Sequence, residues 1–261
     1  MVTSQTLLLA VDIGNTNVTI GLYDGDTLNT TWRISSITPK TMDECRMAFQ
    51  DLFSGAKLDP THCRGIVICS VVPRLTQAVS QALQQLTRIT PKIIGQDIII
   101  PITNQYKDPS QVGQDRLVNA FSAWTRYGGP LIIVDFGTAI TIDVVTRDRK
   151  YLGGVIAPGV EISLDALSQR TALLPRIELE FQEKVLGQTT TESIRSGLLH
   201  GFGSLCDGLV QRLKAECAPN AKVIATGGYA KMISTYCKTI DCVNAELTMD
   251  GLKLLWESQQ T

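Results

Sequence analysis

Short apolar runs alternate with helix-like segments along the 261 residues of the chain. Residues 7–12 and 65–71 are short, strongly apolar runs, which is typical of buried strands. Residues 75–86 carry apolar side chains at the spacing of an amphipathic helix, and residues 41–52 begin with an acidic pair that favours a helix start. This alternation predicts an α/β fold.

The pattern restarts near the middle of the chain. Residues 131–136 form a second run of this kind, followed by another apolar run at 140–145, just as residues 7–12 are followed by 18–23. Such a repeat predicts two domains related by duplication. We expect them to cover residues 1–124 and 125–261, with the C-terminal helix able to pack back on the first domain.

Other segments give weaker signals. Segment 153–160 is apolar and punctuated by glycine, and its composition leaves open whether it lines a pocket or only connects elements as a loop. A helix is expected at residues 191–216, with Gly201–Gly203 as a candidate break. The remaining expected elements are strands at 27–34, 93–94, 98–100 and 222–225, and helices at 116–126 and 249–258.

Each half of the chain opens with an acidic, glycine-containing turn. The turns are Asp12-Ile13-Gly14-Asn15-Thr16-Asn17 and Asp135-Phe136-Gly137-Thr138. Glycine lets a backbone approach phosphate closely, N–H and hydroxyl groups donate to phosphate oxygens, and a carboxylate can serve Mg²⁺ bound to the phosphates. One such turn alone is more often an ordinary hairpin connection. Two copies, each behind an apolar strand, favour nucleotide binding.

A third glycine turn, Ala225-Thr226-Gly227-Gly228, also follows an apolar run. It suits close packing against a flat adenine, or a simple connection from strand to helix, and the residues leave both readings open. The chain lacks the Gly-x-x-x-x-Gly-Lys-Ser/Thr motif and has no Gly-x-Gly-x-x-Gly that opens a βαβ unit. A P-loop enzyme and a Rossmann dehydrogenase are therefore disfavoured.

Asp115 and Arg116 lie where a loop is expected to become a helix. A carboxylate there could accept the proton of a substrate hydroxyl in phosphoryl transfer, and a guanidinium could bind a substrate carboxylate. Aspartate is also a favoured helix N-cap, which would leave the arginine solvated. Residue chemistry alone favours the N-cap.

Composition and charge narrow the class of partner. The net charge of −1 provides no polybasic surface, so neither nucleic acid nor a membrane is expected as a partner. The seven cysteines include no Cys-x-x-Cys pair, which disfavours a zinc site or a disulfide framework. Residues 1–6 carry no basic segment and no long apolar run follows them, so we expect a cytoplasmic protein.

Together, the motifs resemble the signature blocks of the type III pantothenate kinases, from about residue 7 to residue 255. The most specific are Gly113-Gln114-Asp115-Arg116 and the Gly-Gly-x-Ile-Ala-Pro-Gly segment at 153–159. The others are the two acidic turns, Thr171-Ala172-Leu173-Leu174-Pro175, Ser196-Gly197 with Asp207-Gly208, and Ala225-Thr226-Gly227-Gly228.

The resemblance implies two ribonuclease-H-like (actin-like ATPase) domains with an ATP cleft between them, and phosphorylation of pantothenate as the first step of coenzyme A synthesis. Asp135 would coordinate a monovalent cation, K⁺ or NH₄⁺, and the protein would be a homodimer. ATP with Mg²⁺ would be bound by Asp12, Ile13, Gly14, Asn15, Thr16, Asn17, Val18 and Thr19, with Asp12 serving Mg²⁺ and Thr138 also touching ATP. Pantothenate would be bound by Tyr106, Gly113, Gln114, Asp115, Arg116 and Thr190, with Asp115 as the base.

Two positions depart from the family pattern. Gln114 stands where a small residue is usual, and Thr189 replaces a residue that is often Asn or Ser, which leaves the choice among Thr189, Thr190 and Thr191 open. Another small-molecule kinase of the superfamily would share both turns but would not explain the Gly-x-Asp-Arg block. A non-catalytic nucleotide-binding regulator would not require Asp12, Asp115 and Asp135 together.

Overall fold

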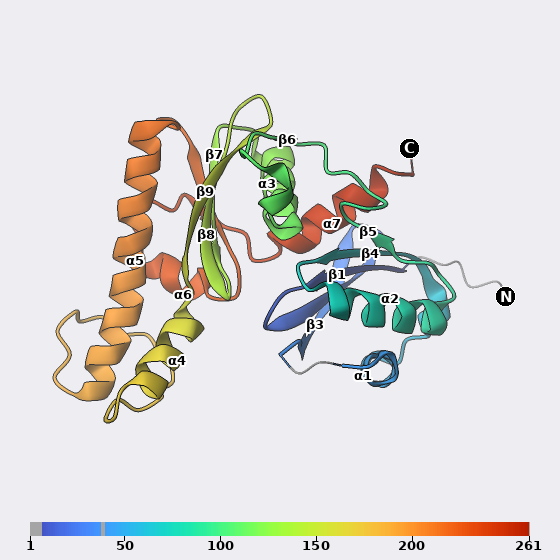
Figure 1. The fold of residues 1–261 in the computed structure, drawn as a ribbon, viewed down its shortest axis with the longest axis horizontal. Coiled ribbons are helices and arrows are strands. Elements are labelled where there is room, and N and C mark those ends of the chain that lie inside the picture. The colour runs from blue at the N-terminus through green and yellow to red at the C-terminus, as the bar shows by residue number, and fades with distance from the viewer. Residues whose placement is uncertain (1–6, 38–39, 261) are drawn as a thin grey trace. The chain divides into compact units, whose positions relative to one another are not determined.

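The computed structural model describes residues 7–37 and 40–260 and confirms the α/β class. The first six residues, whose composition argued against a signal peptide, lie outside this range. The chain divides into two compact units, each with its own sheet (Figure 1). The first unit comprises Met1–Pro101, Ser110–Val118 and Thr248–Thr261, and the second comprises Ile102–Pro109 and Asn119–Leu247. The expected domain boundary after residue 124 stays a prediction.

The first unit contains a five-stranded sheet in the order β3-β2-β1-β4-β5. Strands β1 to β3 are antiparallel, whereas β4 and β5 continue the sheet in parallel with β1. The strands are β1 (Leu7–Ile13), β2 (Asn17–Asp24), β3 (Thr27–Ser35), β4 (Cys63–Ser70) and β5 (Lys92–Ile93). The helices are α1 (Met42–Gly55), η1 (Pro60–His62), α2 (Pro73–Thr87) and α7 (Leu247–Glu257), whose first residue belongs to the second unit.

The second unit contains a six-stranded sheet in the order β11-β10-β7-β8-β9-β6. Its strands are β6 (Thr103–Asn104), β7 (Leu131–Phe136), β8 (Ala139–Val145), β9 (Lys150–Pro158), β10 (Lys222–Thr226) and β11 (Cys242–Val243). Its helices are α4 (Val160–Arg170), α5 (Thr190–Glu216), α6 (Ala230–Ile233) and η3 (Ser234–Tyr236). The division between the units falls within η2 (Pro109–Gln111) and again within α3 (Gln114–Tyr127).

The two sheets have the same topology. If β6 is left out, the second sheet reads β9-β8-β7-β10-β11 from its other edge. Counted from β7, this is the third, second, first, fourth and fifth strand, which is the order of the first sheet. In each, an antiparallel hairpin joins the first two strands and the fourth strand runs parallel to the first. This shared order is the structural counterpart of the repeat in the sequence.

Strand periodicity places each turn aspartate on a particular face of its sheet. In β1, Leu7, Leu9, Val11 and Ile13 pack with α1 and α2, which lie along the same face (Figure 1). Because successive side chains alternate between faces, Asp12 lies on the opposite face. In β7, Ile132, Val134 and Phe136 pack with α4, α5 and α6, so Asp135 likewise lies on the other face.

Three expected elements were wrong. Segment 153–158 is not a loop but the end of β9, paired with β8 from Val144 to Ala139, and Gly153 at φ +131° takes up a register shift there. Helix α5 runs unbroken through Gly201 and Gly203, and the glycine at 203 makes room for the backbone of Tyr236, which a Cβ there would approach to 2.4 Å. Residues 98–100 form no strand and make only a single bridge, from Ile98 to Ile94.

Helix ends follow the sequence signals more closely. Thr41 caps α1 in a reciprocal capping box with Glu44, and the Thr189 hydroxyl accepts from the backbone N–H of Glu192 at the start of α5. Across the described ranges, no helix is long and apolar enough to span a bilayer.

Candidate functional site

The first acidic turn connects β1 to β2 in the first unit. Asp12 is the penultimate residue of β1 and pairs with Thr19 on β2 and Cys69 on β4. The Gly14 N–H donates to the Asn17 carbonyl at 2.9 Å, which closes the turn. Asn15 and Asn17 are exposed at its tip, where their donors are available to a ligand.

Ser36, just after β3, holds this turn in place. Its hydroxyl donates to the Gly14 carbonyl at 2.6 Å, and its backbone N–H donates to the Thr16 carbonyl at 2.9 Å. These two bonds engage carbonyl groups of the turn and use none of its N–H groups. A glycine turn whose carbonyls are bound within the protein is of the kind that can receive an anion.

Asp115 lies in the first turn of α3, one residue past the helix start, so the N-cap interpretation is wrong. The Gly113 carbonyl accepts the first helical bonds, from the N–H groups of Arg116 and Leu117 at 3.2 and 3.4 Å. One Asp115 oxygen, Oδ1, accepts from the Arg116 N–H at 2.8 Å. Arg116 is only 7% exposed, which contradicts a solvated arginine.

Burial raises the pKa of the Asp115 carboxyl, and the hydrogen bond from the Arg116 backbone lowers it in part. An aspartate whose charged form is disfavoured by desolvation is a stronger base than a solvated one. Perturbed carboxylates of this kind are common at functional sites.

Cys69, on β4, is the register partner of Asp12 and bears on both Asp12 and Asp115. Burial raises the pKa of its thiol well above the ordinary range, and the negative charges of Asp12 and Asp115 raise it further. The geometry agrees, because Asp12 is the register partner of Cys69, and a Cβ on Gly113 would lie 2.4 Å from Asp115 Oδ1 and 3.5 Å from the side chain of Val71, two residues after Cys69. Asp12 and Asp115 therefore lie near the same end of β4. We call this group, Asp12, Cys69 and Asp115, the first aspartate cluster.

Glycines give the Asp115 side chain its space. A Cβ atom on Gly113 would lie 2.4 Å from Asp115 Oδ1, closer than any non-bonded contact allows. Gln114, which departs from the family pattern, lies over Gly95 at φ +83°, where a Cβ would be 2.9 Å from the Gln114 Cδ. The bulk of Gln114 is thus accommodated by a glycine on a neighbouring loop.

The second acidic turn, between β7 and β8, contains Asp135. Its Oδ2 accepts from the Asn119 side-chain amide at 3.0 Å, and its register partner on β10 is the buried Thr226. A Cβ on Gly137 would lie 3.2 Å from Asp135 Oδ1, and one on Gly227 would lie 2.3 Å away. We call this group, Asn119, Asp135, Gly137, Thr226 and Gly227, the second aspartate cluster.

The segment after β9 packs directly on this second turn. Gly159 is the N-cap of α4, and its N–H donates to the Thr138 carbonyl at 3.1 Å. A Cβ on Gly159 would lie 2.1 Å from that oxygen and 2.5 Å from the Gly137 carbonyl oxygen. The Ala-Pro-Gly sequence therefore serves close backbone packing, which leaves the Thr138 side chain exposed.

The remaining expected ligand residues of the second unit lie on separate elements. The Tyr106 ring packs on Gly153 of β9, where a Cβ would be 3.4 Å from it, and is half-buried. Thr190 is the exposed first residue of α5, next to the capping Thr189. Because Thr189 uses its hydroxyl for the cap, Thr190 is the better candidate of the two for a ligand contact.

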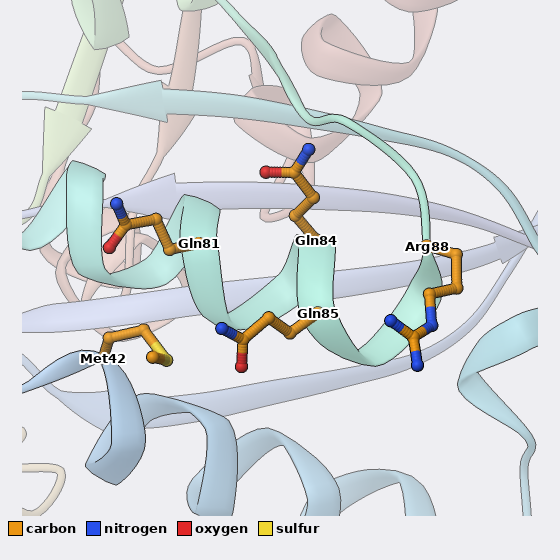
Figure 2. A pocket seen from close by; sticks show the side chains of 5 residues that line it. All are labelled: Met42, Gln81, Gln84, Gln85 and Arg88. Carbon is orange, nitrogen blue, oxygen red and sulfur yellow. The ribbon is translucent and has the colours of Figure 1, made fainter.

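A cavity of about 540 Å³ lies elsewhere in the first unit, against α2 and the start of α1 (Figure 2). Its lining is a thioether, three amides and a guanidinium, with no carboxylate and no glycine turn: Met42, Gln81, Gln84, Gln85 and Arg88. It shares no residue with either aspartate cluster, so its size does not make it the candidate site.

Comparison with known proteins identifies the family. The family model described as "Type III pantothenate kinase" matches residues 8–212. The type III pantothenate kinase of Halalkalibacterium halodurans is 43% identical over 251 residues, covering 96% of this chain and 99% of that protein. The chain belongs to the type III pantothenate kinases.

Solved structures bear out the fold of this pantothenate kinase. The inorganic polyphosphate/ATP-glucomannokinase of Arthrobacter sp. strain KM superposes with a TM-score of 0.52 at 15% identity, covering 97% of this chain and 99% of that one. MreB 5 of Spiroplasma citri bound to AMPPNP gives 0.54 at 11% identity, covering 97% of each. The expected two-domain architecture of actin-like ATPases and sugar kinases is confirmed.

In this pantothenate kinase, the expected site residues fall into two groups, one in each unit. Three residues of the clusters and their supports were missed from the sequence: Ser36, Cys69 and Asn119. Their sequence surroundings carry no local signal of such roles. Ser36 is a small polar residue beyond a strand, Cys69 lies within an apolar run and Asn119 lies within a helix.

Proposed function

We propose that this chain transfers the γ-phosphoryl group of ATP to the terminal hydroxyl of pantothenate, forming 4'-phosphopantothenate and ADP in the first step of coenzyme A biosynthesis. The observation that carries the proposal is the first aspartate cluster, in which the buried carboxylate of Asp115 lies at the same end of β4 as Asp12, beside the glycine turn. Membership of the family supports the choice of substrate.

In the proposed reaction, Asp115 orients the pantothenate hydroxyl and accepts its proton. The hydroxyl oxygen forms a bond to the γ-phosphorus while the bond from that phosphorus to the bridging oxygen of ADP breaks. Arg116 is proposed to bind the pantothenate carboxylate, together with Gly113, Gln114, Tyr106 and Thr190. Positioning and charge neutralisation supply most of the acceleration.

Residues 12–19 are proposed to bind the ATP phosphates, and Thr138 also to contact ATP. The donor set fits Mg²⁺ bound to phosphate, because that ion takes few protein carboxylates and Asp12 supplies one beside the turn. When bound, Mg²⁺ neutralises charge developing on the phosphates.

Asp135 is proposed to coordinate a monovalent cation. Its Oδ1 faces a cradle of two glycines, Gly137 and Gly227, which a single Cβ would fill. A carboxylate oxygen that glycine backbones approach this closely suits a weakly held K⁺ or NH₄⁺ ion, because carboxylate and carbonyl oxygens can then share the ion. The ion would add positive charge near the second turn.

The test is release of ADP by the purified chain, followed with and without pantothenate in K⁺ buffer and again with Na⁺ in place of K⁺. We expect ADP release to require pantothenate and to be slower in Na⁺. ADP formation that ignores pantothenate, or none with it in either buffer, would overturn the proposed substrate.

We further propose that the protein is a homodimer that uses the segment between α4 and α5, residues 171–189. Side chains of α5 anchor this segment: Arg195 donates to the Glu178 carbonyl at 3.1 Å and Ser196 donates to that of Val185. Yet three of its large apolar side chains are mostly exposed, with exposed fractions of 89% for Leu173, 70% for Phe181 and 79% for Leu186. An ordered segment that exposes large apolar side chains is typical of a subunit interface.

Charge on this segment should separate the subunits. The double substitution Phe181→Glu and Leu186→Glu is expected to halve the mass measured by light scattering after size exclusion, because two buried carboxylates would oppose association. Met47→Glu, at a residue 60% exposed on α1, is the matched control and should leave the mass unchanged. A wild-type protein with the mass of one chain would contradict the dimer.

The proposed reaction takes place in the cytoplasm. All seven cysteines are free thiols and Cys45, Cys63, Cys69 and Cys206 are buried, which suits a reducing compartment.

A further inference from the structure

We infer that Asn119 and Gly227 are positioning residues for the proposed cation carboxylate, Asp135. The inference rests on the proposed function, because it deepens the role given to Asp135. Asn119 carries no sequence signal of such a role. The sequence signal at Gly227 left adenine packing and a simple connection both open.

Asn119 determines which way the carboxylate faces. It is 2% exposed on α3, and its Nδ2 donates to Asp135 Oδ2 at 3.0 Å. A hydrogen bond from a buried amide to a charged carboxylate is stronger than one between neutral groups and has little competition from water. With Oδ2 bound in this way, rotation of the carboxylate about its bond to Cβ is restricted, and Oδ1 is directed at the two glycines.

Gly227 provides the space into which Oδ1 projects. It follows Thr226, the register partner of Asp135, and has φ +94°, a conformation that side chains rarely adopt. A Cβ there would lie 2.3 Å from Oδ1 and 2.7 Å from the carbonyl carbon and oxygen of Phe136. The absence of a side chain is therefore required by the carboxylate and by the neighbouring backbone together.

These contacts also explain how the turn is held. The Tyr229 N–H donates to the Phe136 carbonyl at 3.2 Å, and the Gly227 carbonyl accepts from Ala230 at 3.1 Å as α6 begins. The Thr-Gly-Gly turn is thus bonded to the residue that follows Asp135. A side chain at Gly227 would therefore press on both the Asp135 carboxylate and the β7 backbone at Phe136.

The experiment measures K⁺ binding by its effect on melting temperature, in the presence of ATP. KCl replaces tetramethylammonium chloride at constant ionic strength, and the half-saturating K⁺ concentration is read from the rise in Tm. For Asn119→Ala we expect this concentration to increase about tenfold or more, because one charge-assisted hydrogen bond is lost. Pantothenate-dependent turnover should fall at low K⁺ and recover largely at saturating K⁺, a pattern that general loss of structure would not produce.

Ser122→Ala is the matched control. Ser122 lies one turn further along α3, is fully buried, and its hydroxyl has no hydrogen-bond partner within the described structure. Its removal should leave K⁺ binding unchanged. Asn119→Leu keeps the side-chain volume and serves if the alanine variant does not melt cooperatively.

Gly227→Ala gives an independent reading. We expect this substitution to weaken K⁺ binding by a similar or larger factor, since the added Cβ would lie 2.3 Å from Asp135 Oδ1 and displace that oxygen. Half-saturation within twofold of wild type, in Asn119 variants that melt cooperatively, would overturn the inference. A wild-type protein whose Tm ignores K⁺ would overturn it as well, while pantothenate-dependent ADP release in that protein would leave the proposed function standing.

Discussion

Asp115→Asn is expected to lower kcat by roughly 10²–10⁴-fold, the usual contribution of a general base. Asparagine keeps the shape of the side chain and can still accept from the Arg116 N–H, so ATP binding and the start of α3 should be unchanged. The measurement is pantothenate-dependent ADP release together with ATP affinity by calorimetry. A kcat near that of wild type would remove Asp115 from the role of base.

The pH dependence adds a second check on the same residue. Because burial raises the pKa of Asp115, the acid limb of kcat/KM should lie above the value of about 4 that is ordinary for aspartate. The same shift sets the sign for stability. The folded state binds this proton more tightly than the unfolded state, so the contribution of Asp115 to stability falls as pH rises from the unfolded pKa through the folded pKa. Removing the charge should therefore leave Asp115→Asn at least as stable as wild type at pH 7.

Gly113→Ala is expected to reduce kcat by about two orders of magnitude, because the base would be displaced by the new methyl group. The nearest atom to the added Cβ is Asp115 Oδ1, at 2.4 Å, while the next contacts are at 3.5 Å. The side chain can rotate away at little cost, so the fold should tolerate the change and the free energy of unfolding should shift by no more than about 1 kcal/mol. Kinetics and urea unfolding on the same preparation measure the two effects.

The matched control is Gly55→Ala. Gly55 ends α1, and a Cβ there meets nothing within 4 Å. The added methyl should leave kcat unchanged and have a small or favourable effect on stability. If Gly113→Ala lost stability and activity in proportion, Gly113 would be a folding residue and not the one that makes room for the base.

Much of this arrangement could be predicted from the sequence. Strands β1 and β7 are buried except at their aspartates, so their apolar runs are unmistakable, and a carboxylate at the penultimate position of each stands out. The end of β9 could not be recognised, because Gly153, Gly154 and Pro158 are typical of loops and its strand conformation comes from pairing with β8. Tertiary contacts override local preference there.

The clusters themselves depend on register and on contacts between distant segments. Nothing near Cys69 in the sequence indicates that β4 will place it beside Asp12, and nothing near Asn119 indicates that it will face Asp135. The glycines were noticed, but their purpose depends on which atom fills the empty space. For Gly227 that atom belongs to a carboxylate 92 positions earlier, so the sequence around the turn could not indicate this contact.

The shared strand order also has an evolutionary consequence. If one ancestral half was duplicated, the residue beside the turn aspartate on the fourth strand was once the same in both halves, and it is now Cys69 in one and Thr226 in the other. A thiol that stays protonated adds no charge beside Asp12, whereas a hydroxyl offers oxygen beside Asp135. Divergence at a single inherited position would thus have been enough to give two equivalent aspartates the different ions proposed for them.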